Sequence, residues 1–319
     1  MKYQFAIQKY LRKQGIDLSI LNLAYTLAPQ ALHPSFIQQG LSALKYLVET
    51  TNRDPSTILL AGDSAGGNLV ANLLLHLGHP HPDCAQYTLA KKLKGAIMIS
   101  PWISFETTSP SFEKNKHSDY LTKVALNKAS AAFIGPDAKH DAYSQPVDAP
   151  VEWWTEVART AVEDVLVWGG GGEVLIDGIT KFAENVIAGF QASSPTIRAI
   201  SPEGQTTPEK LNRAATERAK LVVSPNEAHE EMIINYLFYI KKEDDGGRQI
   251  KKWLVETLKE LPPSAKEPSA AEVREEVVEK KEGIADDQKS IQDAEEKQDF
   301  REMVEDEKRK AAAAVAPIA

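Results

Sequence analysis

The chain has 319 residues, 42% of them hydrophobic, which is enough for one large domain or two small ones with a buried core. Its formal net charge of −8 argues against a nucleic-acid-binding protein, which would carry clustered basic residues. Its single cysteine, Cys84, excludes an intramolecular disulfide. No run of about eighteen apolar residues predicts a transmembrane segment, and residues 1–16 lack the apolar stretch of a secretory signal, so we expect a cytoplasmic protein.

The N-terminal part of the chain has the pattern of a helix, a strand and a second helix. Apolar spacing predicts an amphipathic helix over residues 3–14, which ends at Gly15. The mostly apolar run Leu18–Tyr25 predicts a strand, and a loop with two prolines follows it. Apolar residues at helical spacing then predict a helix over residues 36–51.

The following segments continue this alternation. Residues 56–61 predict a strand, residues 65–77 a helix, and residues 93–99 another buried strand. Strands that alternate with helices form a parallel sheet that is covered on both faces. The sequence therefore predicts the α/β class, with a mostly parallel sheet flanked by helices.

Residues 103–160 are mixed in pattern and contain four prolines, so the pattern there indicates no single regular element. The later predicted elements are a strand over residues 162–168, a helix over 173–192, a polar surface loop over 193–218, a short strand over 221–223, and helices over 230–241 and 249–261.

The composition changes at Pro262. Charged residues, glutamine and alanine dominate residues 262–319, and large apolar residues are few. This composition predicts a charged low-complexity tail that is disordered or forms a single helix. A dimeric coiled coil with a regulatory role is the alternative, but no apolar heptad pattern persists over about three repeats.

A strand–turn–helix pattern around Ser64 is the most informative part of the sequence. Gly62-Asp63-Ser64-Ala65-Gly66 fits G-x-S-x-G, the nucleophile elbow, and lies between a predicted strand and a predicted helix. Gly62 and Gly66 lack a Cβ, so the strand and the helix can pass close together. The backbone N–H of Ala65 would face a developing oxyanion. Ser64 is therefore the candidate nucleophile; the alternative is a glycine-rich turn with an incidental serine.

The segment from Gly62 through Gly67 to Asn68 resembles the elbow of the hormone-sensitive-lipase-like branch of the α/β-hydrolases. The resemblance covers roughly residues 1–260 and implies an α/β-hydrolase fold, in which Asp63 has a structural role. Further similar segments, especially to fungal esterases related to steryl acetyl hydrolases, are Tyr25-Thr26-Leu27-Ala28-Pro29, Ser100-Pro101-Trp102 and Glu173-Val174-Leu175-Ile176-Asp177.

A serine nucleophile needs a histidine that takes its proton and an acid that orients the histidine. In this fold the order along the chain is serine, acid, histidine. His229 lies just past a short predicted strand and before a helix, so it is the candidate base; the alternative is a surface histidine at a helix start. The resemblance implies Glu173 as the acid, with Asp177 as the alternative. Both acids could instead simply begin a helix, where they favour the N-terminal dipole.

The resemblance also indicates a missing segment. In the family, a His-Gly-Gly-Gly loop after the third strand supplies oxyanion donors, and this motif does not occur in the sequence. The N–H of Ala65 would then be only part of an oxyanion hole. We expect an α/β-hydrolase domain over residues 1–261 that lacks its N-terminal part with the first three strands. Residues 103–160 would border the substrate pocket.

The function implied by the resemblance is a serine carboxylic-ester hydrolase that acts on a small apolar or acetylated ester. No metal or organic cofactor is implied, no nucleic-acid partner is expected, and the oligomeric state stays open. The alternative is a weak or inactive hydrolase remnant that binds a ligand or a partner. Three histidines, His76, His79 and His81, lie near Cys84, but their spacing matches no standard metal-ligand pattern, so we expect a solvated loop there.

Overall fold

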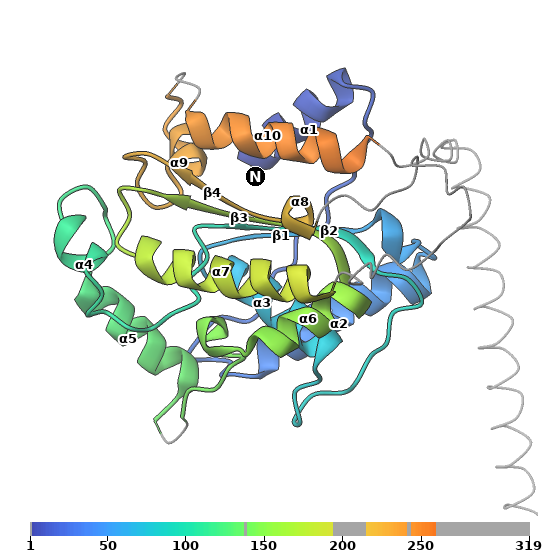
Figure 1. The fold of residues 1–319 in the computed structure, drawn as a ribbon, viewed down its shortest axis with the longest axis horizontal. Coiled ribbons are helices and arrows are strands. Elements are labelled where there is room, and N and C mark those ends of the chain that lie inside the picture. The colour runs from blue at the N-terminus through green and yellow to red at the C-terminus, as the bar shows by residue number, and fades with distance from the viewer. Residues whose placement is uncertain (1, 137–138, 194–214, 241–243, 260–319) are drawn as a thin grey trace, which may run out of the picture. The chain divides into compact units, whose positions relative to one another are not determined.

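The computed structural model describes residues 2–136, 139–193, 215–240 and 244–259 (Figure 1). Within these residues the strands form one sheet in the order β1-β2-β3-β4, and every neighbouring pair is parallel. The prediction of a parallel α/β sheet is therefore confirmed. The strands are β1 (Leu59–Asp63), β2 (Leu93–Ile99), β3 (Val162–Gly170) and β4 (Ala219–Ser224).

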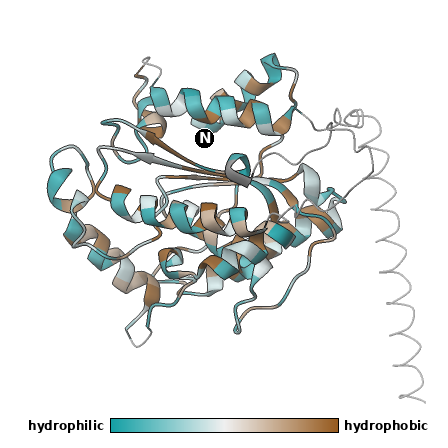
Figure 2. Ribbon diagram, in the orientation of Figure 1, coloured by the Kyte–Doolittle hydropathy of each residue, from teal (hydrophilic) through white to brown (hydrophobic). Residues whose placement is uncertain are grey.

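Helices cover the sheet on both faces, and each helical layer encloses its own apolar core (Figure 1). Hydrophobic residues run along the sheet between the two layers, whose outer turns are largely hydrophilic (Figure 2). Burial on both faces of the sheet is what a parallel arrangement requires. One layer contains α2 (Ser35–Lys45), α3 (Ala65–Gly78), α6 (Val151–Thr160) and α7 (Ile176–Ser193). The other contains α1 (Lys2–Lys13), α9 (Glu231–Leu237) and α10 (Asp245–Leu258).

The predicted helices are confirmed, with shifts at their ends. The helix predicted over residues 36–51 is α2 followed by a π-helical turn, Tyr46–Thr50. The strand predicted from residue 56 begins only at Leu59, because Pro55–Thr57 forms a 3-10 turn. The side chain of Asp54 caps that turn by accepting the N–H of Ser56 at 2.9 Å.

Residues 103–160, whose pattern is mixed, contain helices of 4 to 12 residues joined by loops. These are α4 (Ser111–Lys114), α5 (Lys123–Ile134) and a 3-10 turn, Pro146–Asp148, which precede α6. A further short helix, α8 (Ala215–Arg218), leads into β4. Most of the predicted surface loop over residues 193–218, and the whole of the predicted charged tail from residue 262, lie outside the described residues.

The strand predicted over Leu18–Tyr25 is wrong. This segment has no regular secondary structure, and β1 forms the edge of the sheet within the described residues. An apolar run becomes a strand only when a neighbouring strand satisfies its backbone, and none pairs with this segment in the described part of the chain. Its middle apolar side chains, those of Ile20, Leu21 and Leu23, are consequently exposed, whereas Leu18 and Tyr25 at its ends pack against the two cores.

Among the described residues, no helix is both long and apolar enough to cross a bilayer.

The close packing of α6 on α7 depends on Gly189. A Cβ placed on Gly189 would lie 2.4 Å from the Cβ of Trp154, whose side chain is fully buried and meets Phe182 edge to face. A glycine in a helix interior costs stability through backbone entropy, so its use here indicates that the space is needed.

We therefore expect Gly189→Ala to lower the free energy of unfolding by about 1–3 kcal/mol, the usual cost of overpacking. Gly40→Ala in α2 is the matched control, because its nearest neighbour is a leucine side-chain atom at 3.4 Å. The control variant should be as stable as the parent or more stable, since alanine favours helix. Urea unfolding followed by circular dichroism measures both. Equal stability of Gly189→Ala and the parent would contradict this packing argument.

Candidate active site

Strand β1 ends in a sharp turn that presents Ser64 at the carboxyl edge of the sheet. Ser64 has a φ of 49° and a ψ of −115°, an uncommon conformation for a residue with a side chain. Its N–H donates to the carbonyl of Ile99 at 2.9 Å, and its own carbonyl accepts the N–H of Trp102 at 3.0 Å. The segment after β2 therefore holds the strained serine in place.

The glycines of the elbow are required at two positions. A Cβ on Gly62 would lie 2.2 Å from the carbonyl oxygen of Gly66, and a Cβ on Gly67 would lie 2.8 Å from Pro101. A Cβ on Gly66 would meet nothing within 4 Å, so the expectation of a steric requirement at that position is wrong. The backbone of Gly66, at the start of the helix, packs directly against Gly62 in the strand. Only a residue without a Cβ fits at position 62.

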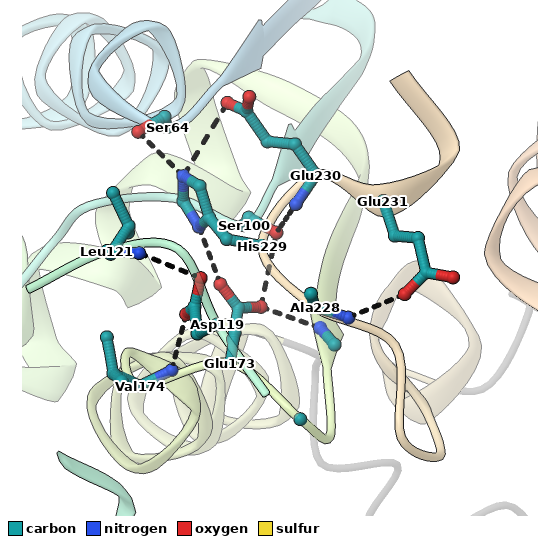
Figure 3. A network of polar contacts seen from close by, with 12 residues as sticks. Ser64, Ser100, Asp119, Leu121, Glu173, Val174, Ala228, His229, Glu230 and Glu231 are labelled. Atoms are coloured by element: carbon teal, nitrogen blue, oxygen red, sulfur yellow. Dashed lines mark hydrogen bonds and ion pairs between the residues drawn. The ribbon is translucent and has the colours of Figure 1, made fainter. Parts of the chain in front are cut away.

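Three side chains that are far apart in the sequence meet beside this turn (Figure 3). The Nε2 atom of His229 lies 3.0 Å from Oγ of Ser64, and its Nδ1 atom lies 2.7 Å from Oε2 of Glu173. His229 and Glu173 are both fully buried, whereas Ser64 is half-buried. The structure thus brings the candidate nucleophile, base and acid into one hydrogen-bonded line.

The other acid considered from the sequence, Asp177, lies in a different place. Its carboxylate accepts the N–H of Ser111 at 2.7 Å at the start of α7. Asp177 also lines a cavity of about 320 Å³ together with Phe112 and Lys181. The structure does not bring Asp177 to His229.

The four glycines before Glu173 place its turn directly against the loop that carries His229. A Cβ on Gly170 would lie 2.2 Å from the carbonyl oxygen of Glu227. The N–H of Gly172 donates to that same carbonyl at 2.8 Å, and the N–H of Gly171 donates to the carbonyl of Ser224 at 2.8 Å. The glycine turn and the histidine loop are therefore in direct backbone contact, and this short separation lets the side chain of Glu173 reach His229.

The carboxylate of Glu173 is held at both oxygens. Oε2 faces His229, and Oε1 accepts the N–H of Gly170 at 2.6 Å and the hydroxyl of Ser100 at 3.1 Å. Burial raises the pKa of Glu173, and the hydrogen bonds from His229 and Gly170 oppose that rise. Burial alone would lower the pKa of His229, but the hydrogen bond and charge of Glu173 and the nearby carboxyl of Glu230 raise it above its ordinary value.

A loop from the irregular region secures the acid from the other side. The side-chain amide of Asn115 donates to the carbonyl of Glu173 at 2.7 Å, and the hydroxyl of Ser118 donates to the carbonyl of Gly172 at 2.7 Å. The carboxylate of Asp119 accepts the N–H of Val174 at 2.7 Å. No local pattern in the sequence indicates these contacts, because each joins residues more than fifty positions apart.

Glu230 is a further acid that the sequence analysis missed. It follows His229 in a left-handed conformation, with a φ of 54°, and its Oε1 lies 3.7 Å from Nε2 of His229 (Figure 3). Burial, together with the charge of nearby Asp63, raises the pKa of Glu230 to about 7. Its position directly after the candidate histidine is the one signal that could have indicated it.

The N–H of Ala65 is the candidate oxyanion donor at the start of α3. Ala65 is exposed, and a first-turn N–H of a helix has no partner within its own helix. Asp63, on the other side of Ser64, is also exposed. Both sequence neighbours of the half-buried Ser64 are therefore exposed to solvent.

Only part of the histidine group near Cys84 forms the solvated loop expected from the sequence. His76, which lies in α3, and His81 are buried, as is Cys84, whereas His79 is exposed, so the expectation is wrong for His76 and His81 alone. The Nε2 atom of His76 contacts the carbonyl of Ala85 at 3.0 Å, and the ring of His79 stacks on Trp153.

One group of possible metal ligands occurs among the described residues, namely His33, His81 and Asp141. The Nε2 atoms of His33 and His81 lie 3.0 and 3.4 Å from Oδ2 of Asp141. The N–H of Asp83 donates to Nδ1 of His81, so a neutral His81 carries its proton on Nε2, the nitrogen that lies 3.4 Å from Asp141. That proton occupies the position a metal would need, and we interpret the group as a hydrogen-bonded hub between loops.

Comparisons with known proteins agree with this architecture. A family model described as "alpha/beta hydrolase fold" matches residues 13–194. Arylacetamide deacetylase-like 2 from Homo sapiens is 27% identical over 144 residues, which are 43% of this chain and 34% of that protein. Probable carboxylesterase 6 from Arabidopsis thaliana is 30% identical over 155 residues, which are 45% of this chain and 44% of that protein. The chain thus spans less than half the length of these relatives.

Two solved structures share the fold. One is an esterase from the bacterial hormone-sensitive lipase family, with a TM-score of 0.53, 22% identity and coverage of 75% of this chain and 65% of that one. The other is carboxyl esterase 2 from the mycorrhizal fungus Tuber melanosporum, with a TM-score of 0.55, 18% identity and coverage of 82% and 73%.

The carboxyl of Glu230 gives a testable prediction for His229. An ionised Glu230 favours the protonated imidazole, so Glu230→Gln should lower the pKa of His229, as measured by NMR titration of its ring. Glu231→Gln is the matched control, since Glu231 accepts the N–H of Ala228 and a glutamine oxygen can accept it too. The control should leave the pKa of His229 unchanged. An unchanged or higher pKa in Glu230→Gln would contradict the prediction.

Proposed function

The chain belongs to the α/β hydrolase fold family, and from that premise we propose that it is a serine carboxylic-ester hydrolase. The single observation that carries the proposal is the hydrogen-bonded line from Ser64 through His229 to Glu173. Relatives named as carboxylesterase and deacetylase support the same reaction class. The substrate that we propose, a small apolar or acetylated ester, rests on those names and on the resemblance of the sequence motifs.

The proposed reaction has two halves. Oγ of Ser64 attacks the ester carbonyl carbon while Nε2 of His229 takes the hydroxyl proton, and the N–H of Ala65 donates to the developing oxyanion. The tetrahedral intermediate collapses to an acyl-Ser64, and His229 gives its proton to the departing alkoxide. A water molecule then attacks the acyl group by the same route, which releases the acid and restores Ser64. Glu173 holds the imidazole in the productive tautomer throughout.

Stabilisation of the oxyanion is the least supported step of this mechanism. One donor, Ala65, is supplied at the elbow, and the loss of a single donor in such a hole costs about a hundredfold to a thousandfold in kcat. Exposure of Ala61, Asp63 and Ala65 around the serine favours a second candidate function, a ligand-binding or partner-binding protein with little turnover. The two candidates differ in whether Ser64 is reactive.

Hydrolysis of p-nitrophenyl acetate by the purified chain tests the proposal. Ser64→Ala should abolish turnover. Glu173→Gln should reduce kcat by about a thousandfold to ten-thousandfold, because a neutral amide stabilises the wrong imidazole tautomer. Asp177→Asn, the matched control, should stay within a few-fold of the parent, since Asp177 contacts Ser111 instead of His229. Loss of activity in Asp177→Asn with retention in Glu173→Gln would reverse the assignment of the acid.

Labelling with a fluorophosphonate separates the esterase from the binding protein. The folded esterase should react covalently at Ser64, with the reaction lost in Ser64→Ala. A folded protein that neither hydrolyses the ester nor reacts with the probe would overturn the proposed activity.

A further inference from the structure

Ser100 occupies a central place in the site although it is not one of the three reacting side chains. It follows β2, which lies between the strand that leads to Ser64 and the strand that leads to Glu173. Its side chain is fully buried. It therefore contacts both neighbours from the middle of the sheet edge.

The backbone around Ser100 joins the neighbouring strands. The N–H of Ser100 donates to the carbonyl of Trp168 on β3 at 2.8 Å. The preceding carbonyl, that of Ile99, accepts the N–H of Ser64 at 2.9 Å. Any displacement of this residue would be transmitted to the nucleophile and to the strand that carries the acid.

The hydroxyl of Ser100 connects the acid to the histidine loop (Figure 3). Its Oγ accepts the N–H of Glu230, the residue after His229, at 3.1 Å. The single hydroxyl proton is donated to Oε1 of Glu173 at 3.1 Å. With Oε1 anchored in this way, rotation of the carboxylate is restricted, and Oε2 stays on Nδ1 of His229.

The conformation of Ser100 indicates that its side chain is needed. Its φ is 46°, in the left-handed region where glycine is unstrained and a residue with a Cβ pays a penalty. A glycine would remove that strain and would also remove the hydroxyl. Since the hydroxyl satisfies a buried carboxylate oxygen and a backbone N–H, it offsets the conformational cost.

We propose that Ser100 is a positioning residue, whose hydroxyl fixes Glu173 and the loop of His229 to one another in the arrangement that proton transfer requires. This inference rests on the proposed esterase activity for its kinetic readout. A second readout, the hydrogen bond between His229 and Glu173, can be measured whether or not the protein is an esterase.

The test uses Ser100→Gly and Ser100→Ala in the full chain. The glycine variant removes the hydroxyl and also relieves the backbone strain. It can therefore be measured even if the alanine variant does not fold. Ser144→Ala is the matched control, because Ser144 is also fully buried and its hydroxyl hydrogen-bonds within its own loop, to Asp141. Circular dichroism establishes that each variant is folded.

For the Ser100 variants we expect kcat for p-nitrophenyl acetate to fall about tenfold to a hundredfold, the effect of one hydrogen bond to a charged group, with a smaller change in KM. The acid limb of the pH profile should move to higher pH. Loss of a donor makes Glu173 more basic, and a more basic Glu173 favours the protonated form of His229. Ser144→Ala should keep the parental limb. A residue with a merely structural role would lower the melting temperature without moving this limb.

The proton NMR resonance of Nδ1–H of His229 gives the independent readout. It should be present in the parent and in Ser144→Ala, and shifted or lost in Ser100→Gly. An unchanged resonance together with an unchanged acid limb in folded Ser100→Gly would overturn the proposal. If the parent shows the resonance but no hydrolysis that depends on Ser64, the esterase proposal fails, and the resonance in Ser100→Gly alone decides the role of Ser100.

Discussion

The contact between the glycine turn after β3 and the carbonyl of Glu227 is the constraint on which the site depends. No side chain fits between these two backbones, since a Cβ on Gly170 would lie 2.2 Å from that carbonyl oxygen. The close approach brings Glu173 and His229, which are 56 positions apart, to a separation of 2.7 Å. It also allows a glutamate to occupy the acid position while both of its oxygens find donors.

Acidic side chains predominate around His229 and Ser64. Glu173 and Glu230 both approach the imidazole of His229, and Asp63 adds a carboxyl beside the serine. In the proposed reaction, such a set of acids would favour the imidazolium formed when Ser64 gives up its proton, but it would disfavour negative charge on an adjacent oxyanion. Donors to that oxyanion therefore matter more here than in a neutral site, and the raised pKa of Glu230 reduces the unfavourable charge.

How much of the fold and of the site could be predicted depends on how far apart in the sequence the interacting residues lie. The order of strands and helices follows from local patterns, and in a parallel sheet the residues after each strand lie at one edge. The choice of Ser64, Glu173 and His229 among them also needed the elbow motif and the resemblance to a known family. The pattern of Leu18–Tyr25 predicted a strand wrongly, because pairing is a property of neighbours and not of the segment. Contacts such as that of Asn115 with Glu173 depend on side-chain orientations across long sequence separations, which no local pattern encodes.

Backbone strain in the site is supported by the sheet itself. Ser64, Ser100 and Glu230 all have positive φ angles, and all three contact or adjoin the hydrogen-bonded line of side chains. Beyond the ends of the strands, hydrogen bonds continue the ladder: the N–H of Ser64 donates to Ile99, that of Ser100 to Trp168, and that of Gly171 to Ser224. Strained conformations persist only where the surroundings over-determine them. Ser64 and Ser100 are tied to the next strand in this way, and the N–H of Glu230 is tied to the hydroxyl of Ser100. We therefore expect a change at one of these strained residues to affect the others.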